Sequence, residues 1–182
     1  MSLTFRTLGL MIFLGCAGLL GFGYYLELVK GIEPCPLCLI QRAFFALAGL
    51  TGLIAAIHNP RTLGIRIYSA LIAIFSLAGG LVAGRQVWLQ HLPKDQVPEC
   101  GPGLEYMLQA YPFGDVLTQV FKGSGECAEA GWTFLGLSIA EWALACFVVL
   151  TITGILGGIF KGRAGPRLFT APPIRTNPIK IP

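Results

Sequence analysis

Four long apolar runs constrain what this chain can fold into more than any other feature of its sequence. They extend over residues 7–26, 43–57, 67–84 and 142–160, and none contains a charged residue within its interior. With its flanks, each run reaches about 20 residues, the length of helix that crosses a hydrocarbon core of about 30 Å. The composition agrees, since 54% of the residues are hydrophobic and 12% are charged. The sequence therefore predicts an all-α membrane protein built as a four-helix transmembrane bundle.

We expect one four-helix domain over residues 1–161, with helices at about 7–28, 39–57, 67–90 and 139–160. The first helix is interpreted as uncleaved, because its apolar run continues past the faint lipoprotein-like site at Cys16. Outer loops are predicted at about 29–38 and 91–138, and the Pro-rich basic tail at 162–182 is expected to be irregular. The long loop carries apolar residues at helical spacing, which predicts a short amphipathic helix: Phe113, Val116, Leu117, Val120 and Phe121.

The charged residues are distributed unevenly between the two predicted faces. The N-terminus, the loop near residues 58–66 and the tail hold eight of the thirteen cations and none of the nine acids. By the positive-inside rule, both termini are expected in the cytoplasm and the longer loops on the far face, which in a bacterial cell is the oxidising one. The basic balance thus reports membrane topology, and we expect no nucleic-acid partner.

Four cysteines fall on the outer side of this topology, as Cys35 with Cys38 and, in the long loop, Cys100 with Cys127. A Cys-x-x-Cys at a helix start is typical of exchangeable disulfides, because the helix N-terminus stabilises a thiolate. Turn-forming residues surround both loop cysteines, so we expect them on mobile backbone. The alternatives are a static disulfide in the loop or half of a zinc site. The long spacing of the second pair disfavours zinc, and no metal is expected.

Further residues surround the first pair in the predicted topology. Cys35 is expected to cap the second helix with Pro36 in its first turn. Arg42 follows Cys38 by one turn, where it can stabilise a thiolate or a negatively charged electron acceptor, although snorkelling to the interface is the alternative. His91 ends the third helix on the same face and can donate to a carbonyl acceptor, or it is simply solvated. Cys16 and Cys146 lie within apolar runs and are expected to be packing thiols.

A dithiol oxidised in each cycle requires an electron sink. The sequence contains no haem motif, Rossmann glycine pattern or flavin fingerprint. A lipid-soluble acceptor such as a quinone is therefore the economical choice. The residues alone predict a membrane thiol oxidoreductase and leave its direction and partner open.

At these residues the chain resembles the DsbB family of bacterial disulfide bond formation proteins. The resemblance covers residues 7–160, and the motifs that carry it are Pro34-Cys35-Pro36-Leu37-Cys38 with Arg42, Arg85-Gln86 with His91, Cys100, Gly125-Glu126-Cys127-Ala128-Glu129, Trp132, Phe134-Leu135-Gly136-Leu137 and Trp142. The proline between the first two cysteines and the long tail are departures from the pattern.

The resemblance implies an inner-membrane enzyme in which Cys100 and Cys127 reoxidise a soluble thioredoxin-fold oxidant of the DsbA type. Electrons would pass to Cys35 and Cys38, and then to ubiquinone, or to menaquinone when oxygen is scarce. Arg42 carries over as the quinone-side charge and His91 as a quinone contact. Two alternatives remain: a vitamin K epoxide reductase-like enzyme, in which the Cys-x-x-Cys follows the loop pair, and a non-enzymatic scaffold with structural disulfides or bound zinc.

Overall fold

The computed structural model describes residues 5–32, 34–93, 111–112, 114–115, 125–128 and 132–161. Four long helices make up most of this part of the chain, namely α1 (Phe5–Lys30), α2 (Pro36–His58), α3 (Thr62–Gln90) and α7 (Ile139–Leu156), which continues as the π-helical turn η1 (Gly157–Lys161). Each is long and apolar enough to cross a membrane, with α7 counted to residue 160. The chain is thus a helical multi-pass membrane protein, and the predicted four-helix bundle is confirmed.

The helices follow the apolar runs but extend past several predicted ends. α1 begins at residue 5 and ends at 30, and α2 begins at 36. α3 begins five residues before the predicted start at 67, because Asn59 and Pro60 confine the break between α2 and α3 to a short turn. Asn59 adopts the left-handed conformation, with φ 45°, and caps α2.

The bundle buries few of its apolar side chains. Large hydrophobic residues such as Met11, Leu28, Ile57 and Leu81 are more than half exposed. In the membrane span at residues 139–160, the most apolar stretch has a mean hydropathy of 2.4, yet only 17% of its residues are buried within the protein. Apolar side chains that lack protein neighbours over the length of a membrane-spanning helix are those that face lipid.

Neighbouring helices pack in the order α1 with α2, α2 with α3, and α3 with α7. Glycines permit the closest approaches. A Cβ on Gly9 of α1 would lie 2.6 Å from the carbonyl oxygen of Gly52 in α2, and one on Gly154 of α7 would lie 3.0 Å from the backbone nitrogen of Ala73 in α3. Such contacts let backbones meet directly, as small residues do in membrane helices.

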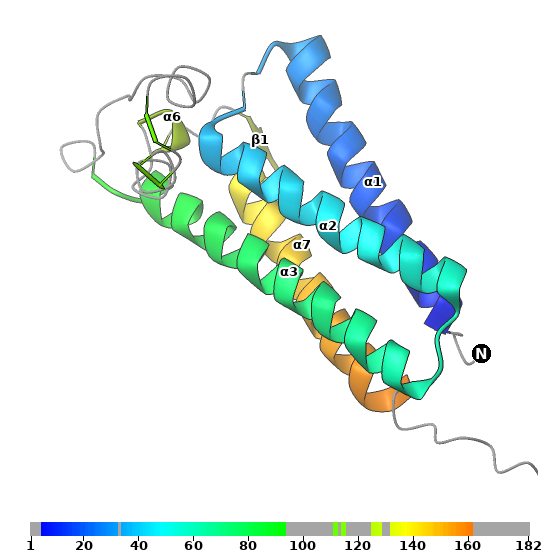
Figure 1. Ribbon diagram of the computed structural model, residues 1–182. Coiled ribbons are helices and arrows are strands. Elements are labelled where there is room, and N and C mark those ends of the chain that lie inside the picture. Colours follow the sequence, from blue (N-terminus) through cyan, green and yellow to red (C-terminus); the bar gives the residue numbers. More distant parts are fainter. Residues whose placement is uncertain are drawn as a thin grey trace, which may run out of the picture.

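Figure 1 shows that the ends of the bundle differ in what they carry. The start of α1, the connection between α2 and α3, and the end of α7 lie together at one end. The start of α2 and the end of α3 lie at the other end, beside the short helix α6 (Gly125–Ala128). A small hairpin of β1 (Thr133–Phe134) and β2 (Leu137–Ser138) leads into α7 at that second end.

The hairpin sets the start of α7 through its turn and its cap. Leu135 and Gly136 have φ of 54° and 82°, the positive values that a two-residue hairpin turn requires. Ser138 then caps α7, with its side chain accepting from the backbone N–H of Glu141 while the Glu141 carboxylate accepts from the backbone of Ser138. The amphipathic helix predicted over residues 113–121 and the tail at 162–182 lie outside the described residues, apart from residues 114–115, which are helical.

Candidate thiol redox site

Three cysteine side chains lie in one buried cluster at the second end of the bundle. Cys35 and Cys127 are 7% and 0% exposed, and they share an apolar cluster with Leu37, Val82 and Leu89, against which the half-buried Cys38 packs. Cys35 and Cys38 come from the start of α2, and Cys127 comes from α6, which packs on α3 and α2. Two helix segments far apart in the sequence thus bring their thiols to the same place.

The start of α2 follows the predicted geometry. Cys35 is the N-cap residue in extended conformation, Pro36 occupies the first turn, and the backbone N–H of Leu39 donates to the Cys35 carbonyl. The Cys35 thiol makes no capping hydrogen bond and lies instead with its sulfur 3.0 Å from the sulfur of Cys38. One turn of helix therefore holds the two thiols within reach of disulfide formation.

Cys127 lies in a helical turn and is completely buried, in one apolar cluster with Leu37 and Leu89. The mobile backbone expected at both loop cysteines stays a prediction. The pKa of the Cys35 thiol is raised, most by its hydrogen bond with Cys127, next by its hydrogen bond with Cys38, and then by burial. Cys35 is therefore held as a protonated thiol beside two other sulfurs. Cys100 lies outside the described residues.

Two buried glutamines, which sequence analysis did not assign to the site, complete its polar part. The amide nitrogen of Gln86 on α3 lies 3.4 Å from the sulfur of Cys35 and 3.3 Å from that of Cys38. Its amide oxygen accepts from Gln41 on α2 at 2.6 Å. In the sequence both glutamines lie just outside an apolar run, next to Arg42 and Arg85, and the available signal for Gln86 was the Arg85-Gln86 motif.

Arg42 is held against α1. Its guanidinium pairs with the Glu27 carboxylate, donates to the carbonyl of Gly23 at 3.2 Å, and lies 5.0 Å from the ring centre of Tyr24. Gly23 leaves room for this arrangement, because a Cβ there would lie 3.4 Å from the Arg42 Nε. The described contacts of Arg42 thus run to α1 and include none to a cysteine sulfur.

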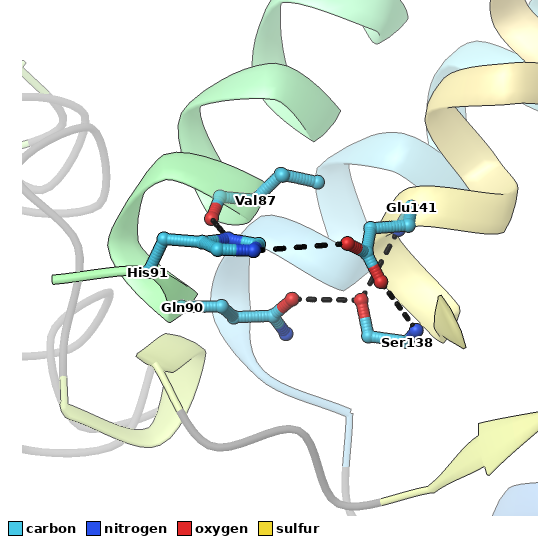
Figure 2. A network of polar contacts seen from close by, with 5 residues as sticks. All are labelled: Val87, Gln90, His91, Ser138 and Glu141. Atoms are coloured by element: carbon cyan, nitrogen blue, oxygen red, sulfur yellow. Dashed lines mark hydrogen bonds and ion pairs between the residues drawn. The ribbon is translucent and has the colours of Figure 1, made fainter. Parts of the chain in front are cut away.

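His91 lies apart from the sulfur cluster, between the end of α3 and the start of α7 (Figure 2). Its Nδ1 is 2.9 Å from the carbonyl oxygen of Val87, which makes that nitrogen the donor, and its Nε2 is 4.0 Å from a Glu141 carboxylate oxygen. The neighbouring Gln90 accepts from the Ser138 hydroxyl at 2.7 Å. This network joins α3 to the cap of α7, and the His91 side chain remains 68% exposed.

A groove of about 490 Å³ separates α1 from α7 and is lined almost entirely by apolar side chains. Leu8, Ile12 and Leu19 line it from α1, and Trp142 and Val149 line it from α7. The two remaining described cysteines, Cys16 and Cys146, also border this groove and pack in the central apolar cluster, as expected of packing thiols. Among the described residues, no group of three or more His, Cys, Asp or Glu side chains could hold a metal ion.

The chain is similar to known proteins over most of its length. The family model described as Disulfide bond formation protein DsbB matches residues 5–157. A Disulfide bond formation protein B of Hahella chejuensis is 56% identical over 149 residues, which are 82% of this chain and 90% of that protein. Proteins of the same name from an Azoarcus species (51% over 142 residues, 78% and 85%) and, as protein B 1, from Pseudomonas aeruginosa (51% over 143 residues, 79% and 88%) are similar.

Proposed function

The chain belongs to the DsbB family of membrane disulfide bond formation proteins, and we propose that it reoxidises a periplasmic DsbA-type oxidant and passes the electrons to a membrane quinone. Family membership supports an oxidoreductase that makes disulfides in a membrane. The partner, the acceptor and the roles of individual residues are our proposal. Cys35, Cys38, Cys100 and Cys127 are the catalytic residues in it.

The observation that carries this proposal is the burial of Cys127 against the Cys35–Cys38 pair. A loop cysteine with only a structural role would need no contact with a second pair. Here the Cys127 thiol is hydrogen-bonded to Cys35, whose sulfur is 3.0 Å from that of Cys38. The sulfurs of Cys127, Cys35 and Cys38 thus follow one another in space, which gives thiol–disulfide exchange a direct route from α6 to the start of α2.

Each step of the proposed cycle moves two electrons. The reduced partner gives two thiol protons and two electrons to a Cys100–Cys127 disulfide, so the partner gains a disulfide and the loop pair becomes a dithiol. Exchange then moves the disulfide: the loop thiols attack the Cys35–Cys38 bond, the loop pair is reoxidised, and Cys35 and Cys38 are left reduced. Oxidation of that pair releases two electrons and two protons to the acceptor.

An apolar acceptor fits the surroundings of this end of the bundle. A quinone supplies the two-electron, two-proton oxidising capacity that the Cys35–Cys38 dithiol needs, and ubiquinone or menaquinone has the required solubility in lipid. The groove between α1 and α7 suits the apolar tail of a quinone. Leu19, which lines the groove, precedes Gly23 by one turn of α1, and the Gly23 carbonyl accepts a hydrogen bond from Arg42. Arg42 is proposed to face the acceptor's polar ring, and His91 to contact it from the end of α3.

We propose that the protein spans the bacterial inner membrane with both termini in the cytoplasm. The basic residues Arg6, Arg61, Arg66 and Lys161 belong to the end of the bundle where α1 starts and η1 finishes. The start of α2 and α6, which carry Cys35, Cys38 and Cys127, lie at the opposite end (Figure 1). This separation supports a cytoplasmic location for the basic end by the positive-inside rule. The cysteines then face the periplasm, the oxidising compartment.

Rapid mixing of the purified, reconstituted protein with a reduced DsbA-type oxidant and ubiquinone tests the proposal. We expect stoichiometric disulfide formation in the oxidant and loss of quinone absorbance. Cys38→Ser should abolish quinone reduction, whereas Cys100→Ser should abolish oxidation of the partner while the Cys35–Cys38 pair still exchanges electrons with quinone. Tyr68→Phe is a control at the opposite end of the bundle, where the Tyr68 hydroxyl contacts His58, and it should turn over normally.

A scaffold with static disulfides predicts a different outcome. Its cysteines would keep their redox state on mixing, and no quinone would be consumed by the unmodified protein. Normal turnover by Cys38→Ser or Cys100→Ser would likewise contradict the assigned roles. For the topology, a membrane-impermeant thiol reagent applied to spheroplasts should label Cys100 after reduction, and labelling only after lysis would reverse the orientation.

A further inference from the structure

Gln41 and Gln86 form a buried amide pair across the contact between α2 and α3. Each residue is 4% exposed, and both lie in helices that span the membrane. Burying a primary amide away from water costs free energy unless its donors and acceptor are matched. Each of these amides is therefore expected to have hydrogen-bond partners within the protein.

The Gln86 amide is bonded on one side to another amide and on the other side to sulfur. Its oxygen accepts from Gln41 Nε2 at 2.6 Å, and its nitrogen lies 3.4 Å and 3.3 Å from the sulfurs of Cys35 and Cys38. Because the Gln41 nitrogen can only donate, the oxygen of Gln86 must face it. This leaves the Gln86 NH₂ group directed at the two sulfurs.

The same amide can serve Cys38 in either protonation state without moving. As a thiol, Cys38 can donate to the Gln86 oxygen, from which its sulfur is 3.5 Å away. As a thiolate, Cys38 can only accept, and the Gln86 nitrogen at 3.3 Å is in place to donate. Other titratable groups facing Cys38 are Cys35 and Cys127, whereas Arg42 is paired with Glu27 of α1.

A packing role alone does not account for these contacts. Glutamines often join membrane helices by bonding to each other, and Gln41 with Gln86 would satisfy that role through one amide contact. The nitrogen of the Gln86 amide is directed at sulfur instead. A neutral thiol is a weak hydrogen-bond acceptor, and a thiolate is a strong one. The geometry is thus matched to a charge that exists only while Cys38 reacts.

We propose that Gln86 is a further catalytic residue, which stabilises the Cys38 thiolate through its amide N–H, and that Gln41 is its positioning residue. When Cys38 ionises, its S–H bond breaks, the proton passes to water, the electron pair stays on sulfur and the hydrogen bond from Gln86 takes over. The inference rests on the proposed function, in which the reduced Cys38 is the donor to the acceptor.

Alkylation of Cys38 by iodoacetamide tests this inference without any quinone or partner. The fully reduced protein in detergent is treated at about pH 7 and about pH 10, and modification of Cys38 is followed by peptide mass spectrometry. Gln86→Met, which keeps the length and removes the amide, should slow alkylation about tenfold at the lower pH, because a hydrogen bond to a charged group is lost. Near pH 10, where bulk hydroxide ionises the thiol, the variant should approach the unmodified protein.

Gln41→Met provides the second measure, since it removes no group that touches sulfur. We expect the rate of Cys38 alkylation to fall about threefold at the lower pH, because the Gln86 amide is free to rotate once its bond to Gln41 is removed. Gln90→Met is the matched control on α3. The Gln90 amide accepts from Ser138 and contacts none of the described cysteine sulfurs, so the rate of Cys38 alkylation should be unchanged. Equal rates for Gln86→Met and Gln90→Met would overturn the inference, as would a slowing that persists at the higher pH. Quinone turnover is a separate measurement, so either proposal can fail alone.

Discussion

Replacing Gly79 by alanine tests the contact that holds α3 against α7 below the sulfur cluster. An added Cβ would lie 2.4 Å from two ring carbons of Phe147, closer than any real contact. The ring has little freedom to move aside, because it is fully buried and stacks on Phe45 with the ring centres 3.9 Å apart. We therefore expect α3 and α7 to be pushed apart or the aromatic stack to be disrupted.

Gly84 on the same helix allows the magnitude to be isolated. A Cβ at Gly84 would meet no atom of the described residues within 4 Å. Both substitutions gain the same preference for alanine over glycine in a helix, about 1 kcal/mol. Overpacking of a filled core costs about 1–3 kcal/mol, and only Gly79→Ala incurs it. The two variants should thus differ in unfolding free energy by about 1–3 kcal/mol, with Gly84→Ala the more stable.

Unfolding of each variant in mixed micelles, titrated with a denaturing detergent, gives this difference directly. Phe147→Leu should partly rescue Gly79→Ala, because the smaller side chain vacates the space that the new methyl group needs. A double-mutant cycle then yields a coupling energy of about 1 kcal/mol or more. Equal stabilities for the two alanine variants, or no coupling to Phe147, would refute the proposed packing.

Four further outcomes follow from the site. In Cys38→Ser, the Cys35 thiol should attack the Cys100–Cys127 disulfide, which forms a Cys35–Cys127 disulfide and leaves Cys100 as a thiol, because the Cys35 and Cys127 thiols are already hydrogen-bonded; peptide mapping of the oxidised variant before any reduced partner is added detects the new disulfide, and a free Cys35 would contradict the geometry. Since the pKa of Cys35 is raised, its alkylation should be slower than that of an exposed cysteine at about pH 8 and should rise only at higher pH; reaction at the ordinary rate would show that Cys35 is not held as a thiol. Arg42→Met should weaken apparent quinone affinity more than it lowers stability, with Arg42→Lys milder, whereas unchanged affinity in the Met variant would leave a structural pair with α1 as its role. Ser138→Ala should lower the unfolding free energy by about 1 kcal/mol through loss of the α7 cap, and an unchanged value would mean that the hairpin alone sets the helix start.

Much of the fold could be predicted because its signals are local. A run of about 20 apolar residues must form a helix in lipid whatever its neighbours are, since no other structure satisfies its backbone there. The placement of Cys35 and Pro36 at the start of α2 followed for the same reason, because capping depends on a few adjacent residues. The uneven distribution of cations likewise needs no tertiary contact to indicate a topology.

The contacts between helices could not be predicted in the same way. Small residues at positions 80 and 84 of the sequence are compatible with close packing. The residue in tight contact is their neighbour Gly79, whereas a Cβ on Gly84 would touch nothing in the part of the chain that the structure describes. An apolar helix in lipid has no polar face to reveal its rotation, so the sequence pattern does not distinguish which glycine meets the next helix.

The sequence by itself determined that the chain crosses the membrane four times and presents a Cys-x-x-Cys at one helix start, because length, hydrophobicity and capping act over a few residues. Only the tertiary structure decided that Cys127 is buried beside Cys35, that Arg42 pairs with Glu27, and that Gln86 faces the sulfurs. Those contacts join residues 15 to 92 positions apart in the sequence. They depend on how each helix is rotated and how α6 packs on α3 and α2, and both are settled by packing and by the need to satisfy buried polar groups.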